Sequence, residues 1–244
     1  PLAGMVMGAT AEGLAQSLQI SRQEQDEFAL ASQQKAAAAQ AAGTFDTEIS
    51  PVEVVHRKGT QIIRADEHLR PDTTMESLGK LPAVFDRQGT VTAGNSSGIT
   101  DGAAALILMD SDLARERGIE PLAYLGETRA AGVDPKVMGI GPVPAVRALQ
   151  AVNGLAVSDY DLIELNEAFA AQVLACDREL HLPLDRLNVN GGSIALGHPI
   201  GATGARIVVT LLHELARRGG EHGLATLCIS GGMGLATAFH RSPR

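Results

Sequence analysis

The sequence predicts an α/β protein in which a mixed sheet is layered with helices, together with a loop-rich region. Three observations support this prediction. Strand-like and helix-like segments alternate from residue 121 onward, the chain closes on two apolar segments around a glycine-rich turn, and residues 64–100 are rich in Pro, Gly, Asp and Thr. Alternation of strands and helices is typical of α/β folds, and a closing pair of this kind indicates an antiparallel hairpin. The sheet is therefore expected to contain both strand directions.

The first 63 residues are expected to form two helices and a pair of strands. Residues 10–18 are rich in alanine, and Ser21 with Glu24 three residues later has the capping-box pattern that begins a helix. This second helix should end near Gly43. Residues 45–63 then alternate with a period of two, which indicates strands.

Residues 64–120 are expected to be a loop region followed by one strand and one helix. The loop should be ordered because apolar anchors punctuate it, namely Leu78, Leu81, Val84 and Phe85. Residues 101–110, DGAAALILMD, are a near-continuous small apolar run, which favours a strand buried on both faces. The segment SDLARERG predicts a helix that starts on Ser111 or Asp112.

The rest of the chain should supply the core of the domain. The expected segments are a strand at 124–132, a helix at 142–149 with prolines in its first turn, a strand at 161–165, helices at about 167–180 and at 204–218, and a strand pair at 224–230 and 235–240.

Composition excludes several classes of protein. The 244 residues are 45% hydrophobic and 20% charged, which is globular rather than disordered. The net charge of −8 disfavours broad binding to nucleic acids or membrane surfaces, and no apolar run reaches the length of a membrane span. Two cysteines, Cys176 and Cys228, cannot form a disulfide framework, so a reducing, cytoplasmic compartment is expected. No metal site is expected.

The segment that most strongly suggests a functional site is residues 188–215, where five glycines surround His198. Glycine lets the backbone approach a ligand closely, and Pro199 biases His198 away from helical backbone. A histidine held in this way could act as a general base, or it could be an incidental histidine in a βα turn. The spacing leaves both interpretations open, although it excludes a P-loop and a dinucleotide fingerprint.

Two further residues stand at the ends of expected strands. Cys228 precedes glycines, whose N–H groups could stabilise a thiolate, although most free cysteines are simply small buried hydrophobes. Asn166 follows the strand 161–165, at the sheet edge where open α/β proteins place their sites, but it could equally be a helix N-cap.

Taken together, these segments resemble the thiolases (acetyl-CoA acetyltransferases and 3-ketoacyl-CoA thiolases). LNEAFAAQ looks like the NEAF motif of that family, NVNGGSIALGHPIGATGAR like its GHP block, and LCISGGMG like its C-terminal cysteine block. The resemblance runs from about Met7 to the end of the sequence. It implies a thiolase-like fold and CoA-dependent cleavage of 3-ketoacyl-CoA to acetyl-CoA and a shortened acyl-CoA, or the reverse Claisen condensation. Coenzyme A would be a substrate, and no cofactor is implied.

The resemblance also implies roles for individual residues. His198 would activate a nucleophilic cysteine, and Cys228 would be the acid/base that moves a proton to or from acetyl-CoA. Asn166 would hold a water that stabilises the oxyanion or enolate, and the backbone N–H of Ser230 would form a second oxyanion hole. The residues expected to bind coenzyme A or line the thioester end are Arg70, Ser77, Ala93, Ser97, Met138, Phe169 and Gly197.

The sequence departs from the family at the nucleophile. Neither Cys176 nor Cys228 stands at the position of the nucleophilic cysteine, which the family carries in an N-terminal half-domain. We therefore expect a C-terminal portion of a thiolase, in which residues 1–99 cover coenzyme A, residues 100–120 are a remnant of the N-terminal core domain and residues 121–244 are the C-terminal core domain. The nucleophile would come from a missing N-terminal part or from a separate N-terminal fragment.

Two classes of function follow from these expectations. One is an acyltransferase that is complete in its native form, and the other is a non-catalytic CoA-binding or assembly subunit. The family implies a homodimer or homotetramer, with acyl-CoA and coenzyme A as small-molecule partners.

Overall fold

The computed structural model describes residues 3–243, so the first two residues of the expected 1–99 region and the last residue of the 121–244 region lie outside it. Four strands form one mixed sheet in the order β3-β6-β5-β4. β6 pairs antiparallel with β3 and with β5, whereas β4 pairs parallel with β5. The expected mixed sheet is confirmed; its strands are β3 (Tyr124–Gly132), β4 (Leu162–Leu165), β5 (His222–Ile229) and β6 (Met233–His240).

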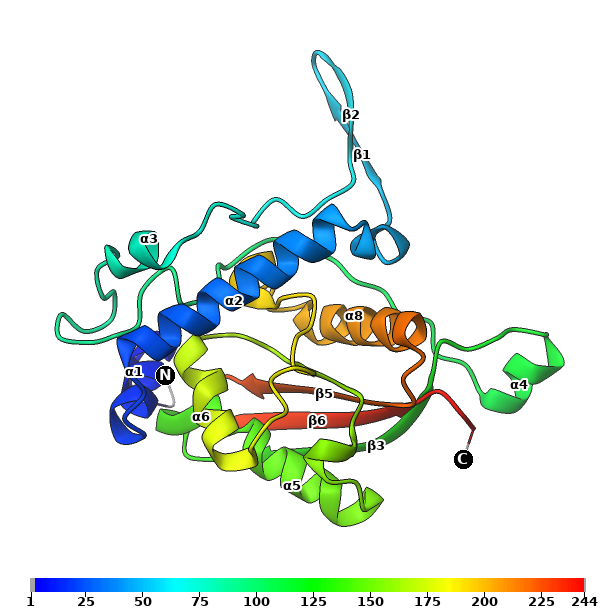
Figure 1. The fold of residues 1–244 in the computed structure, drawn as a ribbon. Helices are drawn as coiled ribbons and strands as arrows, with labels where there is room; N and C mark the ends of the chain where they lie inside the picture. The colour runs from blue at the N-terminus through cyan, green and yellow to red at the C-terminus, as the bar shows by residue number, and fades with distance from the viewer. Residues whose placement is uncertain (1–2, 244) are drawn as a thin grey trace.

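Helices cover both faces of this sheet (Figure 1). On one face lies α8 (Thr203–Arg218), and on the other lie α5 (Pro142–Asn153) and α6 (Ala170–Leu180). β4 serves both layers, because Leu162 packs with the apolar face of α8 while Ile163 packs in the core formed with α5 and α6. Such alternation follows from the period of two along a strand.

The N-terminal helices form where the sequence predicts them. They are α1 (Met7–Ser17) and α2 (Arg22–Ala41). Ser21 Oγ accepts from the Glu24 N–H while the Glu24 carboxylate accepts from the Ser21 N–H, which completes the capping box. Gly43, with a φ of 70°, then turns the chain out of α2.

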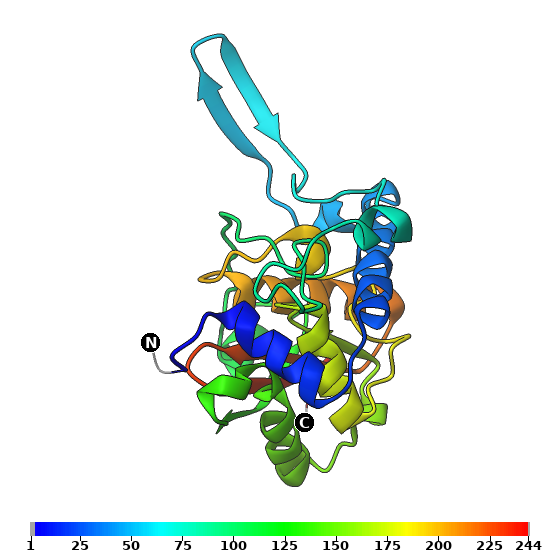
Figure 2. The same cartoon turned by 90° about the vertical axis from the view of Figure 1, so that its left-hand side faces the viewer.

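A two-stranded hairpin projects from the body of the molecule in both views (Figures 1 and 2). It consists of β1 (Val52–His56) and β2 (Gly59–Ile63), paired antiparallel with His56 opposite Gly59. The expected strand pair is confirmed, although the residues from Thr44 to Thr47 form a 3₁₀ turn instead. Val55 is 80% exposed, so the hairpin buries little apolar surface.

The loop region after the hairpin contains one short helix, α3 (Met75–Gly79). Leu78 is buried as expected, but Val84 and Phe85 are exposed, so they are weaker anchors than the sequence suggested. The helix after residue 110 is also confirmed, as α4 (Ser111–Glu116). It stands away from the body of the molecule (Figure 1).

The expected strand at residues 101–110 is wrong. This segment has no regular secondary structure, and Ile107 is 92% exposed. An apolar run forms a buried strand only where neighbouring strands supply hydrogen-bond partners and covering side chains. No strand of the described residues pairs with it. Across the same described part of the chain, no helix combines the length and apolarity needed to cross a membrane.

Candidate active site

Asn166 and Cys228 lie at one edge of the sheet because β4 and β5 run parallel. Leu165 is opposite Thr226 in this pairing, and the Asn166 N–H donates to the Thr226 carbonyl at 3.0 Å. Asn166 thus directly follows the end of β4, while Cys228 is the second-last residue of β5. Carboxyl ends of parallel strands are where open α/β sheets hold their sites.

The Asn166 side chain is a buried hydrogen-bond donor. It is not an N-cap, because α6 begins at Ala170 with Phe169 at the capping position. Its Oδ1 accepts from Ser193 Oγ at 2.6 Å, whereas its Nδ2 has no hydrogen-bond partner among the described residues. Asn166 is only 1% exposed, and a buried amide without a partner is rare. The free Nδ2 can therefore bind a water or a ligand oxygen.

His198 is held by both its backbone and its ring. The His198 N–H donates to the Gly98 carbonyl at 2.8 Å, and Nδ1 lies 2.6 Å from Thr203 Oγ1. Thr203 Oγ1 also lies 3.0 Å from the Pro199 carbonyl, and when its single proton is donated there the hydroxyl accepts from His198. The proton of neutral His198 is consequently on Nδ1, which leaves the Nε2 lone pair free.

The electrostatics around His198 favour this neutral form. Burial lowers the pKa of His198, and the positive charge of Arg206 lowers it further. A neutral imidazole with a free Nε2 can accept a proton, as a general base must. The alternative of an incidental surface histidine does not account for its half-buried ring or for the contact with the fully buried Thr203.

Cys228 is buried and stays protonated. Burial raises the pKa of the Cys228 thiol to about 12, so at neutral pH it carries its proton and suits a proton donor better than a nucleophile. In the turn that follows, Gly231 and Gly232 adopt φ values of 93° and 89°, while Ser230 is not among the residues of positive φ. A serine at position 230 therefore costs no left-handed strain, and its N–H remains available.

Buried charges next to the site were not predicted from the sequence. Burial raises the pKa of Glu164 to about 8, although Arg206, whose Nη1 lies 3.6 Å from a Glu164 oxygen, opposes this. Glu167 is also buried, and it accepts from Ser32 Oγ at 2.7 Å and from Asn188 Nδ2 at 2.8 Å. The two glutamates in LIELNE could have predicted these buried charges. An acidic side chain inside or beside a fully buried strand needs hydrogen-bond or ion-pair partners.

The residues expected near the thioester are brought together in part. Ser97 donates from both its N–H and its hydroxyl to the Ala168 carbonyl, which ties the loop before residue 100 to the segment after β4. Gly197 has a φ of 92°, and a Cβ there would lie 2.5 Å from Thr100. This loop therefore packs against the backbone that carries His198. Phe169 is half-buried, and its ring packs edge-to-face with that of Phe85, with 6.1 Å between the ring centroids.

The other residues expected to bind coenzyme A differ in how exposed they are. Met138 is buried in the 3₁₀ helix Pro135–Ile140, whereas Ala93 is exposed. Arg70 is exposed, and its N–H donates to Gln33 on α2 at 3.0 Å. Ser77 is exposed too, and its hydroxyl is used by the capping box of α3, where it donates to the Thr74 carbonyl at 2.8 Å. Contacts of these residues with coenzyme A stay a prediction.

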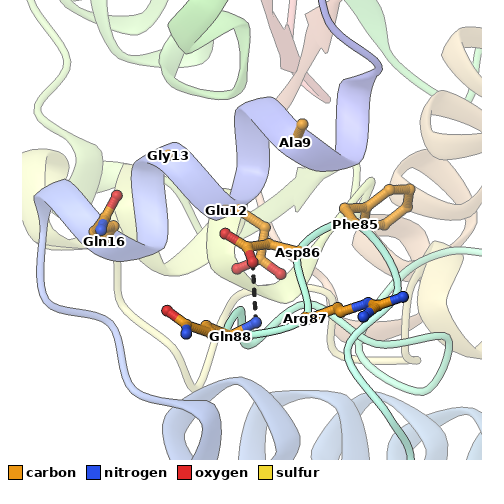
Figure 3. Close-up of a pocket in the computed structure, with 8 residues that line it drawn as sticks. All are labelled: Ala9, Glu12, Gly13, Gln16, Phe85, Asp86, Arg87 and Gln88. Carbon is orange, nitrogen blue, oxygen red and sulfur yellow. Dashed lines mark hydrogen bonds between the residues drawn. The ribbon is translucent and has the colours of Figure 1, made fainter.

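Two cavities lie outside the group formed by Asn166, His198 and Cys228. One, of about 590 Å³, lies between α1 and residues 85–88, and Glu12 is among the residues that line it (Figure 3). Both oxygens of Glu12 accept backbone N–H groups of residues 90 and 91, so this carboxylate fastens a loop. The second, of about 460 Å³, is lined by residues 100–104 and by residues 199–202 with Ala205, next to His198 in the sequence.

Comparison with known families gives two matches that together cover most of the chain. The sequence model described as "Thiolase, C-terminal domain" matches residues 119–241, and the one described as "Thiolase, N-terminal domain" matches residues 2–112. The expected absence of the nucleophile-bearing part is not confirmed by these matches, because a portion of the N-terminal domain is present. No cysteine lies within residues 2–112.

Curated relatives agree with these matches. The "Beta-ketoadipyl-CoA thiolase" of Pseudomonas putida is 56% identical over 96% of this chain, which covers 59% of that protein. The "Acetyl-CoA acetyltransferase" of Rhizobium meliloti (strain 1021) is 54% identical over 98% of this chain, which covers 61% of it. The crystal structure of human mitochondrial 3-ketoacyl-CoA thiolase has a TM-score of 0.94 at 50% identity, covering 97% of this chain and 60% of that one. The chain thus spans about 60% of the length of these relatives.

Proposed function

The chain belongs to the thiolase family, and from this premise we propose that it carries the acid–base part of an acyltransferase site acting on acyl-CoA thioesters. The reaction would be CoA-dependent cleavage of a 3-ketoacyl-CoA to acetyl-CoA and a shortened acyl-CoA, or the reverse condensation. The observation that supports it most is the free, buried Nδ2 of Asn166 at the sheet edge that also holds Cys228, with His198 presented by the adjoining loop.

The chemistry requires three functions from these residues. A cysteine thiolate attacks the 3-keto carbon, and the bond between C2 and C3 breaks with its electrons on the acetyl-CoA fragment. Asn166 Nδ2 would hold a water against the enolate oxygen, and Cys228 would give its proton to C2. His198 Nε2 would accept the proton of the attacking thiol and return it to that cysteine when the acyl group leaves for coenzyme A, while the Cys228 thiolate would take up the proton of coenzyme A. The backbone N–H of Ser230 would bind the oxyanion of the tetrahedral intermediate of acyl transfer.

The nucleophile would come from a cysteine outside these 244 residues. Cys176 is fully buried in α6, where its thiol donates to the Gly139 carbonyl at 3.4 Å, and burial raises its pKa strongly. Cys228 already has the environment of a proton donor. Loop residues Arg70, Ser77, Ala93 and Ser97 would cover coenzyme A, with Met138, Phe169 and Gly197 near the thioester. Coenzyme A would be a substrate, and no cofactor is proposed.

The native protein is proposed to be a homo-oligomer in the cytoplasm. Apolar side chains are exposed on the segment around Ile107 and Leu108 and on the hairpin at Val55. Exposed apolar side chains that cluster on a surface mark contacts with other chains. The alternative function is a CoA-binding or assembly subunit without catalysis, which the lack of a suitable nucleophile in this sequence favours.

Labelling with acetyl-CoA separates the two functions. Native protein is incubated with isotopically labelled acetyl-CoA. The mass of every co-purifying polypeptide is then measured by mass spectrometry under denaturing conditions. If the protein is an acyltransferase, we expect a covalent acetyl group on a cysteine outside these 244 residues. Reversible CoA binding without acetylation would support the assembly subunit, and an active preparation holding only a species of these 244 residues would contradict the proposed source of the nucleophile.

The His198→Ala variant tests the proposed role of His198 as the general base. It should lower thiolysis by at least two orders of magnitude, a typical loss for a general base, while CoA affinity stays nearly unchanged. Equal losses of binding and turnover would make His198 a structural residue.

A further inference from the structure

The unpartnered Nδ2 of Asn166 depends on which way its amide faces. The Asn166 side chain is buried against Ser193, the first residue of α7 (Ser193–Leu196), and Ser193 in turn contacts Arg206 on α8. Ser193 Oγ lies 2.6 Å from Asn166 Oδ1, and Arg206 Nη2 lies 3.2 Å from Ser193 Oγ. The three side chains form a chain of hydrogen bonds that leads from a guanidinium to the amide.

The donors and acceptors of this chain allow one arrangement. A guanidinium can only donate, so the Ser193 hydroxyl accepts from Arg206, and among the hydrogen bonds of the described residues the one acceptor for its single proton is on Asn166. The Asn166 atom that receives this proton is then the carbonyl oxygen. Nδ2 is left on the opposite side, where it is buried without a partner. Arg206 closes one direction to the hydroxyl proton; without Arg206 the proton could turn away from Asn166, the hydroxyl could accept from Nδ2, and the amide could turn to present its oxygen.

We propose that Ser193 and Arg206 are positioning residues that hold the Asn166 amide with its Nδ2 as the free donor. This inference rests on the proposed function, in which that donor serves the enolate oxygen. In that arrangement Nδ2 donates to a water that faces the enolate oxygen; a carbonyl oxygen in its place would take one proton of that water, so the water would stabilise the developing negative charge less than one held by a preorganised N–H donor. The effect therefore belongs to the chemical step and not to the binding of coenzyme A.

Arg206 also faces Glu164, so the test must separate the loss of this contact from the loss of the hydrogen bond to Ser193. Its Nη1 faces the buried Glu164 at 3.6 Å, and Glu48 and Asp66 act on the same guanidinium from a distance. Removing Arg206 would leave Glu164 without its nearby positive charge, which by itself can disturb the site. The double variant Arg206→Met with Glu164→Gln removes that imbalance and leaves the hydrogen-bond chain broken.

The assay is exchange of the acetyl methyl protons of acetyl-CoA with D₂O, followed by NMR, in the native enzyme with all its polypeptides. It reports enolate formation without complete turnover. We expect Ser193→Ala and Arg206→Met each to slow exchange about 10-fold, with the Kd for coenzyme A changed less than twofold. Combining the two should add little, because both break the same chain. Arg206→Lys, which also only donates, should stay within about threefold of wild type.

Two further variants decide between mechanisms. Arg206→Met with Glu164→Gln should stay as slow as Arg206→Met alone, and its return to the wild-type rate would show that Arg206 acts by balancing Glu164. Arg217→Met is the matched control, because Arg217 lies on the same helix and pairs with a different buried carboxylate, Glu214, at 2.6 Å. It should exchange at the wild-type rate. A melting temperature recorded for each variant identifies any loss caused by unfolding.

The outcomes separate this inference from the function on which it rests. A wild-type enzyme that exchanges, together with a folded Ser193→Ala variant that exchanges equally fast, would overturn the inference alone. A wild-type enzyme that neither exchanges nor cleaves a 3-ketoacyl-CoA would overturn the proposed function and the inference with it. An equal fall in CoA affinity and exchange for Ser193→Ala would also overturn the inference, because the residue would then act on binding.

Discussion

At the scale of single residues, the hydroxyl of Thr203 decides which nitrogen of His198 carries the proton. Replacing Thr203 with valine keeps the volume but removes the acceptor for Nδ1–H, which then stays half-buried without a partner. An unsatisfied buried donor costs about 1–3 kcal/mol, so kcat for thiolysis should fall roughly 10-fold or more while KM for coenzyme A changes little. Steady-state kinetics across pH measure this, and the apparent pKa of the base should also change.

A control for this variant lies on the same helix. Thr210 is buried as well, but its hydroxyl donates to Glu48 at 3.3 Å and does not reach His198. Thr210→Val should therefore keep kcat. If Thr203→Val and Thr210→Val behave alike, the contact at 2.6 Å does not orient His198.

The residues that touch Asn166 and His198 were the part of the site that the sequence could not predict. Asn166 and His198 stand out because a strand end and a glycine-rich loop mark their positions locally. Ser193, Thr203 and Arg206 have no local mark, since each acquires its role from a contact with another element. Only the fold brings α7 and α8 to the end of β4.

At the scale of elements, local patterns were enough wherever an element carries its own signal. The capping box of α2, the prolines at the start of α5 and the closing hairpin of β5 and β6 all formed as the sequence indicated. The strand predicted at residues 101–110 did not form because a continuous apolar run indicates only that the segment is suited to burial. Burial requires neighbours, and none of the described strands lies beside it.

This segment should respond to the presence of its partner. In the chain by itself, a protease specific for large apolar residues should cut first at residues 106–109, because an exposed backbone without regular hydrogen bonds enters a protease site easily. In the native protein, where contacts with another chain are proposed to cover this segment, the same bonds should be cut at least 10 times more slowly. Mass spectrometry of timed digests gives both rates, and cleavage within β5 or β6 reports global unfolding. Equal rates at 106–109 would mean that the segment is uncovered in the native enzyme as well.

At the scale of the whole molecule, the buried carboxylates couple stability to pH. Burial raises the pKa of Glu164 to about 8 and that of Glu48 to about 7, both above the usual value of 4.5. Between that value and the raised pKa, the folded state holds protons that the unfolded state has lost. The stabilisation that results is therefore complete below about pH 4.5 and is lost as pH rises through 7 and 8.

The Glu164→Gln variant tests this coupling because glutamine has nearly the same shape and cannot ionise. The free energy of unfolding of the variant minus that of wild type should increase by about 2–4 kcal/mol between pH 5 and pH 8, since each unit of pKa difference corresponds to about 1.4 kcal/mol. Urea denaturation at pH 5, 6.5 and 8 measures it. Glu76→Gln, which changes an exposed side chain paired with Lys80 on α3, is the control and should leave the difference constant. A constant difference for Glu164→Gln as well would mean that Arg206, 3.6 Å away, keeps the carboxylate charged in the folded protein across this range.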